Sequence, residues 1–162
     1  MNPPKVVAMQ CEIAAGSGGL TTLVNAADIY EYLAEKNPDL LLPLFAPDAL
    51  TVERNRLRAT QPIFSSSGHR IYTIFRSDNA AKISVKPESL KGFQLIKEIL
   101  EESKTPIIFK IEANQILVCD NTKILHGRTA FAKEDCRKLN RLWFDGQPDD
   151  FYPLQFGFIP AR

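Results

Sequence analysis

Short apolar segments rich in β-branched and aromatic residues recur along this chain of 162 residues, and they constrain its fold more than any other feature. Such segments predict strands where turn-forming residues bound them. The predicted extended segments are residues 5–11, 21–25, 50–58, 106–111, 116–119 and 137–144, with a hairpin over 61–76. Helical periodicity is confined to residues 26–36, 38–45 and 87–103, and Asn25 can cap the first of these helices. Many strands with only two or three helices favour an antiparallel sandwich or barrel.

Three polar features of these segments each allow a structural and a functional interpretation. Arg54, Arg56 and Arg58 are predicted to share one side of an extended strand, as a solvated face or as a substrate-binding group. His69 follows a Ser-Ser-Ser-Gly turn and is either a polar turn residue or a metal ligand. The tail, residues 145–162, is rich in proline and aromatic residues and is predicted to dock as an extended segment.

Length and composition indicate one soluble globular domain over residues 1–162. Apolar residues make up 44% of the chain and charged residues 24%, and the net charge of +1 provides no field to attract nucleic acid or a membrane surface. No apolar run could span a bilayer, and the first residues lack the apolar core of a signal peptide, so the expected compartment is the cytoplasm. The three cysteines fit neither a zinc site nor a disulfide framework, and Cys11 and Cys119 are predicted to be small hydrophobic residues in strands.

The stretch from Asp120 to Trp143 concentrates the side chains with the most chemistry, namely His126, Arg137 and Arg141. An imidazole is the commonest metal ligand and a guanidinium pairs well with a carboxylate, so the stretch suggests a metal and a carboxylate-bearing cosubstrate. Arg137 and Arg141 are four residues apart and therefore lie on the same side of an extended strand. Periodicity alone leaves open whether that side faces a barrel interior or the solvent. Inward arginines would need an anionic ligand or acidic partners.

Two blocks of this sequence resemble the taurine dioxygenase (TauD/TfdA) and clavaminate synthase-like family of iron(II)/2-oxoglutarate-dependent oxygenases. The first block is Asp-Asn-x-x-x-x-His-Gly-Arg over residues 120–128, followed by the Arg-x-x-x-Arg of Arg137 and Arg141. The second block is Gly-Gly-x-Thr over residues 18–21. The first block is similar to the C-terminal half of the family's domain. The resemblance therefore implies a double-stranded β-helix, or jelly-roll, barrel that is N-terminally incomplete.

The resemblance also implies which residues bind the cofactors of this family, Fe(II) and 2-oxoglutarate. His126 would be the distal iron ligand, Arg137 would bind the far carboxylate of 2-oxoglutarate, and Arg141 would lie near its other end. The hydroxyl of Thr21 would help to hold the same carboxylate as Arg137. The reaction implied is a dioxygenase reaction that couples oxidative decarboxylation of 2-oxoglutarate to hydroxylation of a small substrate, such as an amino acid or another carboxylate.

The family's iron site needs two histidines and one carboxylate, and this chain contains no His-x-Asp or His-x-Glu to complete it. We therefore expect a fragment or split form with impaired activity, which a complementing N-terminal chain would restore. Incomplete sheets would also leave an exposed edge that promotes self-association. The alternative is a catalytically inactive jelly-roll module that binds a carboxylate ligand or a protein partner.

Individual residues keep simpler interpretations. Outside its motif His126 would be an ordinary core or surface histidine, and Thr21 an ordinary β-branched strand residue. Arg128 either orients a substrate or braces its loop. Asp120 and Asn121 are expected to fix the turn before His126 rather than to touch a substrate.

Overall fold

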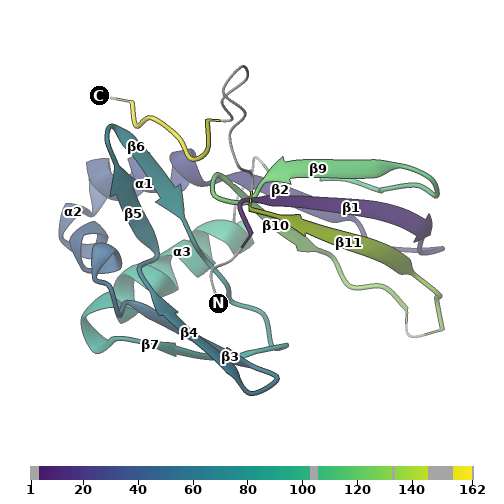
Figure 1. Ribbon diagram of the computed structural model, residues 1–162, viewed down its shortest axis with the longest axis horizontal. Coiled ribbons are helices and arrows are strands. Elements are labelled where there is room, and N and C mark those ends of the chain that lie inside the picture. The colour runs from purple at the N-terminus through teal and green to yellow at the C-terminus, as the bar shows by residue number, and fades with distance from the viewer. Residues whose placement is uncertain (1–3, 103–105, 133, 146–154, 162) are drawn as a thin grey trace.

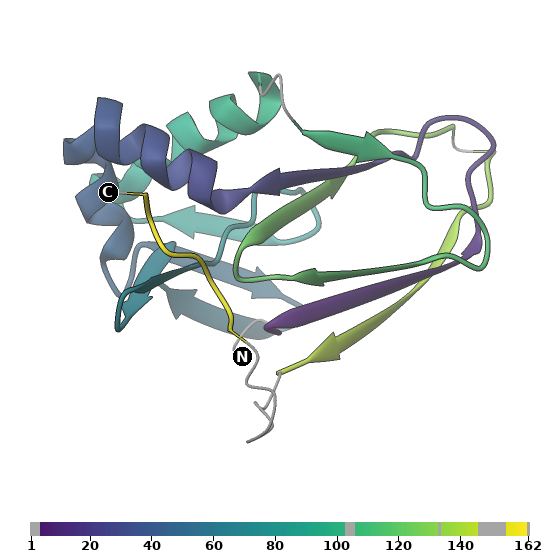
Figure 2. The same ribbon diagram turned by 90° about the horizontal axis from the view of Figure 1, so that it is seen from above.

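Two three-stranded antiparallel sheets face each other, and helices and shorter strands pack beside them (Figures 1 and 2). The computed structural model describes residues 4–102, 106–132, 134–145 and 155–161. Sheet A has the order β11-β1-β9 and consists of β1 (Val6–Ile13), β9 (Ile116–Asp120) and β11 (Lys138–Phe144). Sheet B has the order β10-β2-β8 and consists of β2 (Thr21–Asn25), β8 (Ile107–Phe109) and β10 (Ile124–Arg128).

The other elements lie between β2 and β8 in the sequence. The helices are α1 (Ala26–Lys36), α2 (Pro38–Leu41) and α3 (Leu90–Glu102), with the 3₁₀ segments η1 (Leu42–Phe45) and η2 (Pro87–Ser89). Two smaller sheets, β4-β3-β7 and β5-β6, consist of β3 (Leu50–Arg54), β4 (Leu57–Gln61), β5 (Phe64–Ser67), β6 (Arg70–Thr73) and β7 (Lys82–Val85). None of the described helices has the length and apolar character needed to cross a membrane.

Successive strands of the two large sheets alternate between them. The chain passes from β1 in sheet A to β2 in sheet B, and later from β8 in sheet B to β9, β10 and β11 in sheets A, B and A. This alternation between facing sheets is the jelly-roll topology, and it confirms the predicted mainly β fold class. Among the described strands each large sheet keeps two edges, so the predicted barrel is not closed.

Sheets A and B pack together through their inner faces. Val7, Met9 and Cys119 of sheet A form a small buried cluster, and Ile124 of sheet B packs against it. Cys11 is also buried in β1, so both cysteines predicted as small strand hydrophobes are confirmed. The inner face of each sheet is therefore the face that carries these cluster residues.

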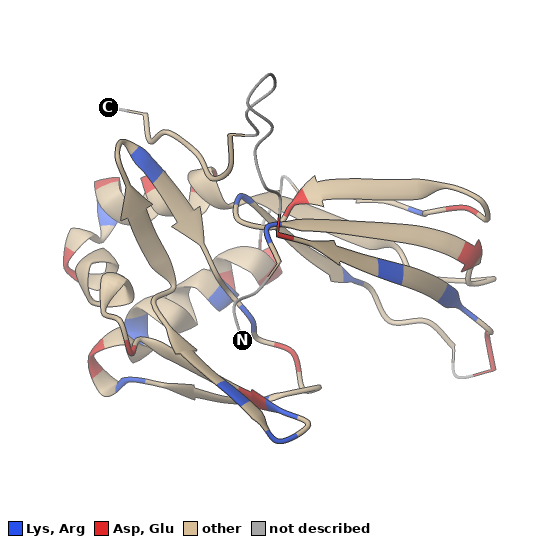
Figure 3. Cartoon of the chain, in the orientation of Figure 1, with Lys and Arg blue, Asp and Glu red and all other residues tan. Residues whose placement is uncertain are grey.

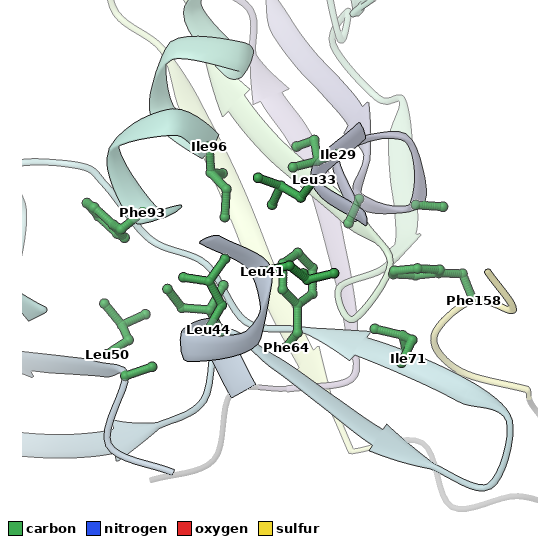
Figure 4. Packing of buried hydrophobic residues seen from close by; sticks show 14 residues of the cluster. Ile29, Leu33, Leu41, Leu44, Leu50, Phe64, Ile71, Phe93, Ile96 and Phe158 are labelled. Atoms are coloured by element: carbon green, nitrogen blue, oxygen red, sulfur yellow. The ribbon is translucent and has the colours of Figure 1, made fainter. Parts of the chain in front are cut away.

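The larger hydrophobic core lies on the other side of sheet B, beneath the helices (Figure 4). Ile29 and Leu33 are four residues apart on α1 and project from one face, where they meet Phe64 of β5. Val24 and Leu125 project from the outer face of sheet B and pack against the same cluster. Sheet B is thus packed on both faces, which holds its inner face in a defined position.

Most predicted elements are confirmed, including the helix over residues 26–36. Its predicted cap is formed because the side-chain oxygen of Asn25 accepts a hydrogen bond of 3.2 Å from the Ala27 N–H. The helix predicted over residues 38–45 is one turn of α-helix followed by a 3₁₀ segment. Ser103, the predicted end of the last helix, lies outside the described residues.

The prediction of a single strand over residues 50–58 is wrong. The chain reverses at Asn55 and Arg56, whose φ angles are 50° and 65°, and β3 pairs with β4 as a hairpin. Asparagine tolerates this left-handed backbone better than most residues, so Asn55 was the turn signal. Arg54 and Arg58 consequently project from opposite faces of the hairpin, and Arg58 lies 3.7 Å from Glu53. The short strand β7, which pairs with the other side of β3, was not predicted.

The described part of the tail docks on the β5-β6 hairpin, as predicted. Ile71 and Phe158 exchange two backbone hydrogen bonds of 2.8 and 2.9 Å. The guanidinium Nε of Arg70 donates to the Phe156 carbonyl at 2.6 Å. His69 occupies the turn of this hairpin, as predicted, and residues 146–154 of the predicted segment lie outside the described part.

The strand β11 is only partly buried. Leu139 packs against the inner cluster, but Leu142 and Trp143 are both 57% exposed. Leu142 lies opposite Ala8 on the outer face of sheet A, where four large apolar side chains are exposed. We call these residues the outer patch: Ile116, Val118, Leu142 and Phe144.

Replacing Leu33 with alanine should lower the free energy of unfolding by about 2–5 kcal/mol, because its fully buried side chain leaves a cavity between α1 and the core. Urea denaturation followed by circular dichroism measures the change. Leu42→Ala is the control, since that side chain is 73% exposed and should cost less than about 0.5 kcal/mol. Equal effects of the two substitutions would contradict the assigned core.

Candidate functional site

His126 and Arg141 lie on the two facing sheets. His126 is two residues from Ile124 on β10 and therefore projects from the inner face of sheet B. Arg141 lies opposite Met9 and therefore projects from the inner face of sheet A. Burial, followed by the positive charge of Arg141, lowers the pKa of the His126 imidazole from its ordinary value. The imidazole is thus held towards its neutral form, which is the form that binds metals.

Thr21 shares the inner face of sheet B with His126. It lies two positions from Leu23, the residue opposite His126, and is itself opposite Arg128 and Phe109. Its side chain is only 3% exposed. A hydroxyl in this position can donate a hydrogen bond to an anion bound between the sheets.

Arg137 immediately precedes β11 and packs against the glycine loop that leads to Thr21. A Cβ added to Gly19 would lie 3.3 Å from Cδ and 3.4 Å from Nε of Arg137, so the guanidinium stem touches the loop backbone. Gly18 and Gly19 have φ angles of 64° and 61°, a conformation that favours glycine. A Cβ at Gly18 would also clash with the Ala130 carbonyl oxygen. The two glycines therefore permit the close approach of Arg137 to the loop that leads to Thr21.

Positive charge is concentrated between the sheets. Burial, then the charge of Arg128, and to a smaller extent that of Arg141, lower the pKa of Arg137, and Cys11 acts in the opposite direction. None of the ion pairs formed within the described residues involves these three arginines. Figure 3 shows Lys and Arg within β10 and β11, whereas Asp and Glu lie near strand ends or in loops around the two sheets. An anion between the sheets would relieve the repulsion among the arginines.

The spacing of these groups along the strands suits an elongated anion. Residues two apart on a strand are separated by roughly 6.5 Å. On sheet B, the Thr21–Arg128 pair therefore lies roughly 6.5 Å along the strands from the Leu23–His126 pair. On sheet A, Arg141 and Arg137 are separated by about twice that distance. His126 and Arg141 therefore form one end of the site, and Thr21, Arg128 and Arg137 form the other. A small dicarboxylate could contact both ends.

The described residues supply a single histidine for a metal. No group of three or more His, Cys, Asp or Glu residues gathers anywhere in the described ranges. His69 lies in the β5-β6 turn, on a different sheet from His126. Because a facial iron(II) triad needs two histidines and a carboxylate, the described residues do not fit a complete iron site.

The turn before His126 is fixed by the two residues expected to do so. One carboxylate oxygen of Asp120 accepts hydrogen bonds from the backbone N–H and the hydroxyl of Thr122, at 2.8 and 2.6 Å. The side-chain amide of Asn121 donates to the Pro4 carbonyl at 2.9 Å. These bonds tie the start of β10 to the segment before β1.

Two aromatic residues near the site were not predicted to belong to it. Trp143 shares a strand face with Arg141, and the guanidinium carbon of Arg128 lies 4.5 Å from the centre of the Phe131 ring. The alternation along β11 could have identified Trp143. Phe131 follows β10 in a loop, so only the folded chain shows its contact with Arg128.

The family model of the Taurine catabolism dioxygenase TauD, TfdA family matches residues 1–143 of this chain. A uridine-5'-phosphate dioxygenase from Amycolatopsis sp is 26% identical over 144 residues, a match that covers 83% of this chain and 52% of that protein. The chain thus spans about half the length of this curated relative.

Several solved structures share the fold. Asparagine oxygenase in complex with Fe(II), 2S,3S-3-hydroxyasparagine and succinate has a TM-score of 0.66 at 18% identity, covering 87% of this chain and 45% of that one. The non-heme iron oxygenase OrfP, in complex with Fe and alpha-ketoglutaric acid, has a TM-score of 0.60 at 16% identity, covering 88% and 45%. PvcB, an Fe, alpha-ketoglutarate dependent oxygenase from an isonitrile synthetic pathway, has a TM-score of 0.58 at 22% identity, covering 87% and 52%. These similarities confirm the jelly-roll fold, and the first two structures hold iron together with a dicarboxylate.

Replacing Arg141 with methionine should raise the pKa of His126, because the substitution removes a nearby positive charge and keeps a side chain of similar length. An NMR titration of the imidazole signals in a His69→Gln background isolates His126 and measures the change. Arg56→Met, in the β3-β4 turn, is the control and should leave the His126 signal unaltered. An unchanged pKa in Arg141→Met would contradict the placement of Arg141 across from His126.

Proposed function

We propose that this chain, which belongs to the taurine catabolism dioxygenase TauD, TfdA family, provides the 2-oxoglutarate-binding part of an iron(II)- and 2-oxoglutarate-dependent dioxygenase. The observation that carries this proposal is the convergence of Thr21, His126, Arg137 and Arg141 on the facing inner surfaces of sheets A and B. Thr21 is more than a hundred positions from the other three residues in the sequence, and Arg141 lies on the opposite sheet from Thr21 and His126.

The residues at the two ends of the site fit 2-oxoglutarate. Arg137 and Thr21 would bind its far carboxylate, because a guanidinium and a buried hydroxyl together offer several donors to one carboxylate. Arg141 would bind nearer the other end, on the level of His126. When bound, 2-oxoglutarate supplies electrons through its oxidative decarboxylation. The substrate that we propose is a small molecule, such as an amino acid or another carboxylate, as the hydroxyasparagine of the solved asparagine oxygenase complex suggests.

For iron, His126 would be one ligand, and no group of three His, Cys, Asp or Glu residues gathers among the described residues to complete the site. We propose that the two further ligands come from a polypeptide segment that pairs with β10. Among the described strands, β10 pairs with β2 alone, so its other edge is open. A residue opposite His126 on an added strand would lie about 4.5–5.5 Å away on the same face, close enough to share a metal ion. This chain would then be one part of the enzyme, and by itself it would have impaired activity.

The incomplete donor set also favours a second candidate function. The chain would then be a catalytically inactive jelly-roll module that binds a carboxylate through its arginines. The two candidates differ in their dependence on metal. Carboxylate binding that needs no metal supports the module, whereas binding that requires iron(II) supports the enzyme.

Replacing Arg137 with glutamine should weaken 2-oxoglutarate binding by roughly tenfold or more, because one charge-assisted pair is lost. Isothermal titration calorimetry measures the affinity, with and without iron(II), which also separates the two candidate functions. Arg58→Gln, on the β3-β4 hairpin, is the matched control and should bind as the parent chain does. If Arg137→Gln bound 2-oxoglutarate as tightly as the parent chain, the proposed site would be wrong.

We also expect the chain to self-associate through its open strand edges and the outer patch. Introducing lysine at Val118 and Leu142 should shift sedimentation velocity profiles towards a monomer, because two charges then oppose burial of the patch. Leu57→Lys is the control, since Leu57 is 52% exposed on another sheet. A monomeric parent chain would show that these surfaces do not associate.

A further inference from the structure

Arg128 belongs to the motif that carries the family resemblance, but the resemblance assigns it no role in cofactor binding. It ends β10 two residues after His126, and it lies directly opposite Thr21 of β2. Directly opposed residues in an antiparallel pair project from the same face. The Cβ atoms of such a pair are about 4.5–5.5 Å apart, so the stem of Arg128 starts next to the Thr21 hydroxyl.

Arg128 is exposed to solvent, and its guanidinium contacts an aromatic ring. Its central carbon lies 4.5 Å from the centre of the Phe131 ring, a cation–π contact. The segment that carries Phe131 is bonded to the glycine loop, because the Leu20 N–H donates to the Thr129 hydroxyl at 2.9 Å and the Thr129 N–H donates to the Leu20 carbonyl at 2.9 Å. The loop that positions Thr21 and Arg137 therefore positions Arg128 as well.

Two like charges are thus placed at one end of the site. The charge of Arg128 is, after burial, the largest contribution that lowers the pKa of Arg137. The neighbouring loop carries two acidic residues, Glu134 and Asp135. Asp135 accepts hydrogen bonds from the backbone N–H of Ser17 at 2.9 Å and from its hydroxyl at 3.4 Å. No ion pair within the described residues joins Glu134 or Asp135 to Arg128 or Arg137. The pair of guanidiniums beside Thr21 therefore lacks an acidic partner among the described side chains, and a bound carboxylate would supply one.

We propose that Arg128 binds the far carboxylate of 2-oxoglutarate together with Arg137 and Thr21, and that it makes the site select keto acids with two carboxylates. This inference rests on the proposed function. Two guanidiniums that bind one carboxylate select for its negative charge and for its planar shape, since each guanidinium can donate two parallel hydrogen bonds. A keto acid that ends in a methyl group would form neither charge-assisted pair and would bind more weakly than 2-oxoglutarate.

The test compares 2-oxoglutarate with 2-oxopentanoate, which has the same chain length and lacks the far carboxylate. Trp143 is the only tryptophan and lies on the inner face of sheet A, so its fluorescence reports binding, with calorimetry as a second readout. Arg128→Gln should weaken 2-oxoglutarate binding about tenfold and leave 2-oxopentanoate binding unchanged. The 2-oxoglutarate affinity of Arg128→Lys should lie between those of the parent chain and Arg128→Gln, because lysine keeps the charge and loses the planar fork. Phe131→Leu should weaken 2-oxoglutarate binding by a smaller factor, since it removes only the aromatic support.

Arg58→Gln is the control for loss of one exposed arginine and should alter neither affinity. Circular dichroism of each variant establishes that it is folded. If Arg128→Gln binds both keto acids as the parent does while Arg137→Gln loses 2-oxoglutarate binding, the inference fails and the proposed function stands. An equal loss for both keto acids in Arg128→Gln would also overturn the inference, because it would indicate a purely structural role. If neither Arg137→Gln nor Arg128→Gln changes binding, the proposed function fails and the inference with it.

Discussion

The packing of Ile124 against Val7, Met9 and Cys119 holds sheets A and B face to face, and every other feature of the candidate site depends on it. This contact is apolar and therefore fixes the separation of the sheets without selecting a register. The register comes from the hydrogen-bonded ladders, which place Met9 opposite Arg141 within sheet A. A polar site can form between the sheets because the apolar cluster occupies only part of their inner faces.

The remainder of those inner faces carries several positive charges that repel one another. Arg128, Arg137 and Arg141 are close enough to influence one another or His126, and their mutual repulsion opposes the packing that brings them together. The apolar core on the far side of sheet B provides stability that can offset this repulsion, since it is by far the larger of the two clusters. A chain organised this way is stable enough to keep several cations in one place and gains further stability when an anion binds.

Local sequence signals predicted the elements that depend on local physics. The helix α1 follows from the four-residue spacing of Ile29 and Leu33 and from the Asn25 cap, and β1 follows from a continuous apolar run. The wrong strand over residues 50–58 and the missed β7 differ in cause. Alternation is weak in both segments. The turn at Asn55 was a local signal that could have divided the first segment, whereas the pairing of β7 with β3 joins distant parts of the chain. The exposure of most of β11 was open from the sequence, because apolar character does not say whether another element covers a sheet face.

The sequence by itself determined which chemistry is available: one motif histidine, two arginines at strand spacing and a threonine after two glycines. It also determined the family, since those residue types at those spacings are specific. Only the tertiary structure decided that Arg137 and Arg141 point inward, because a period of two assigns residues to a face and leaves the identity of that face open. Only the tertiary structure, likewise, placed Arg128 beside Thr21, because strand pairing joins residues that are 107 positions apart in the chain.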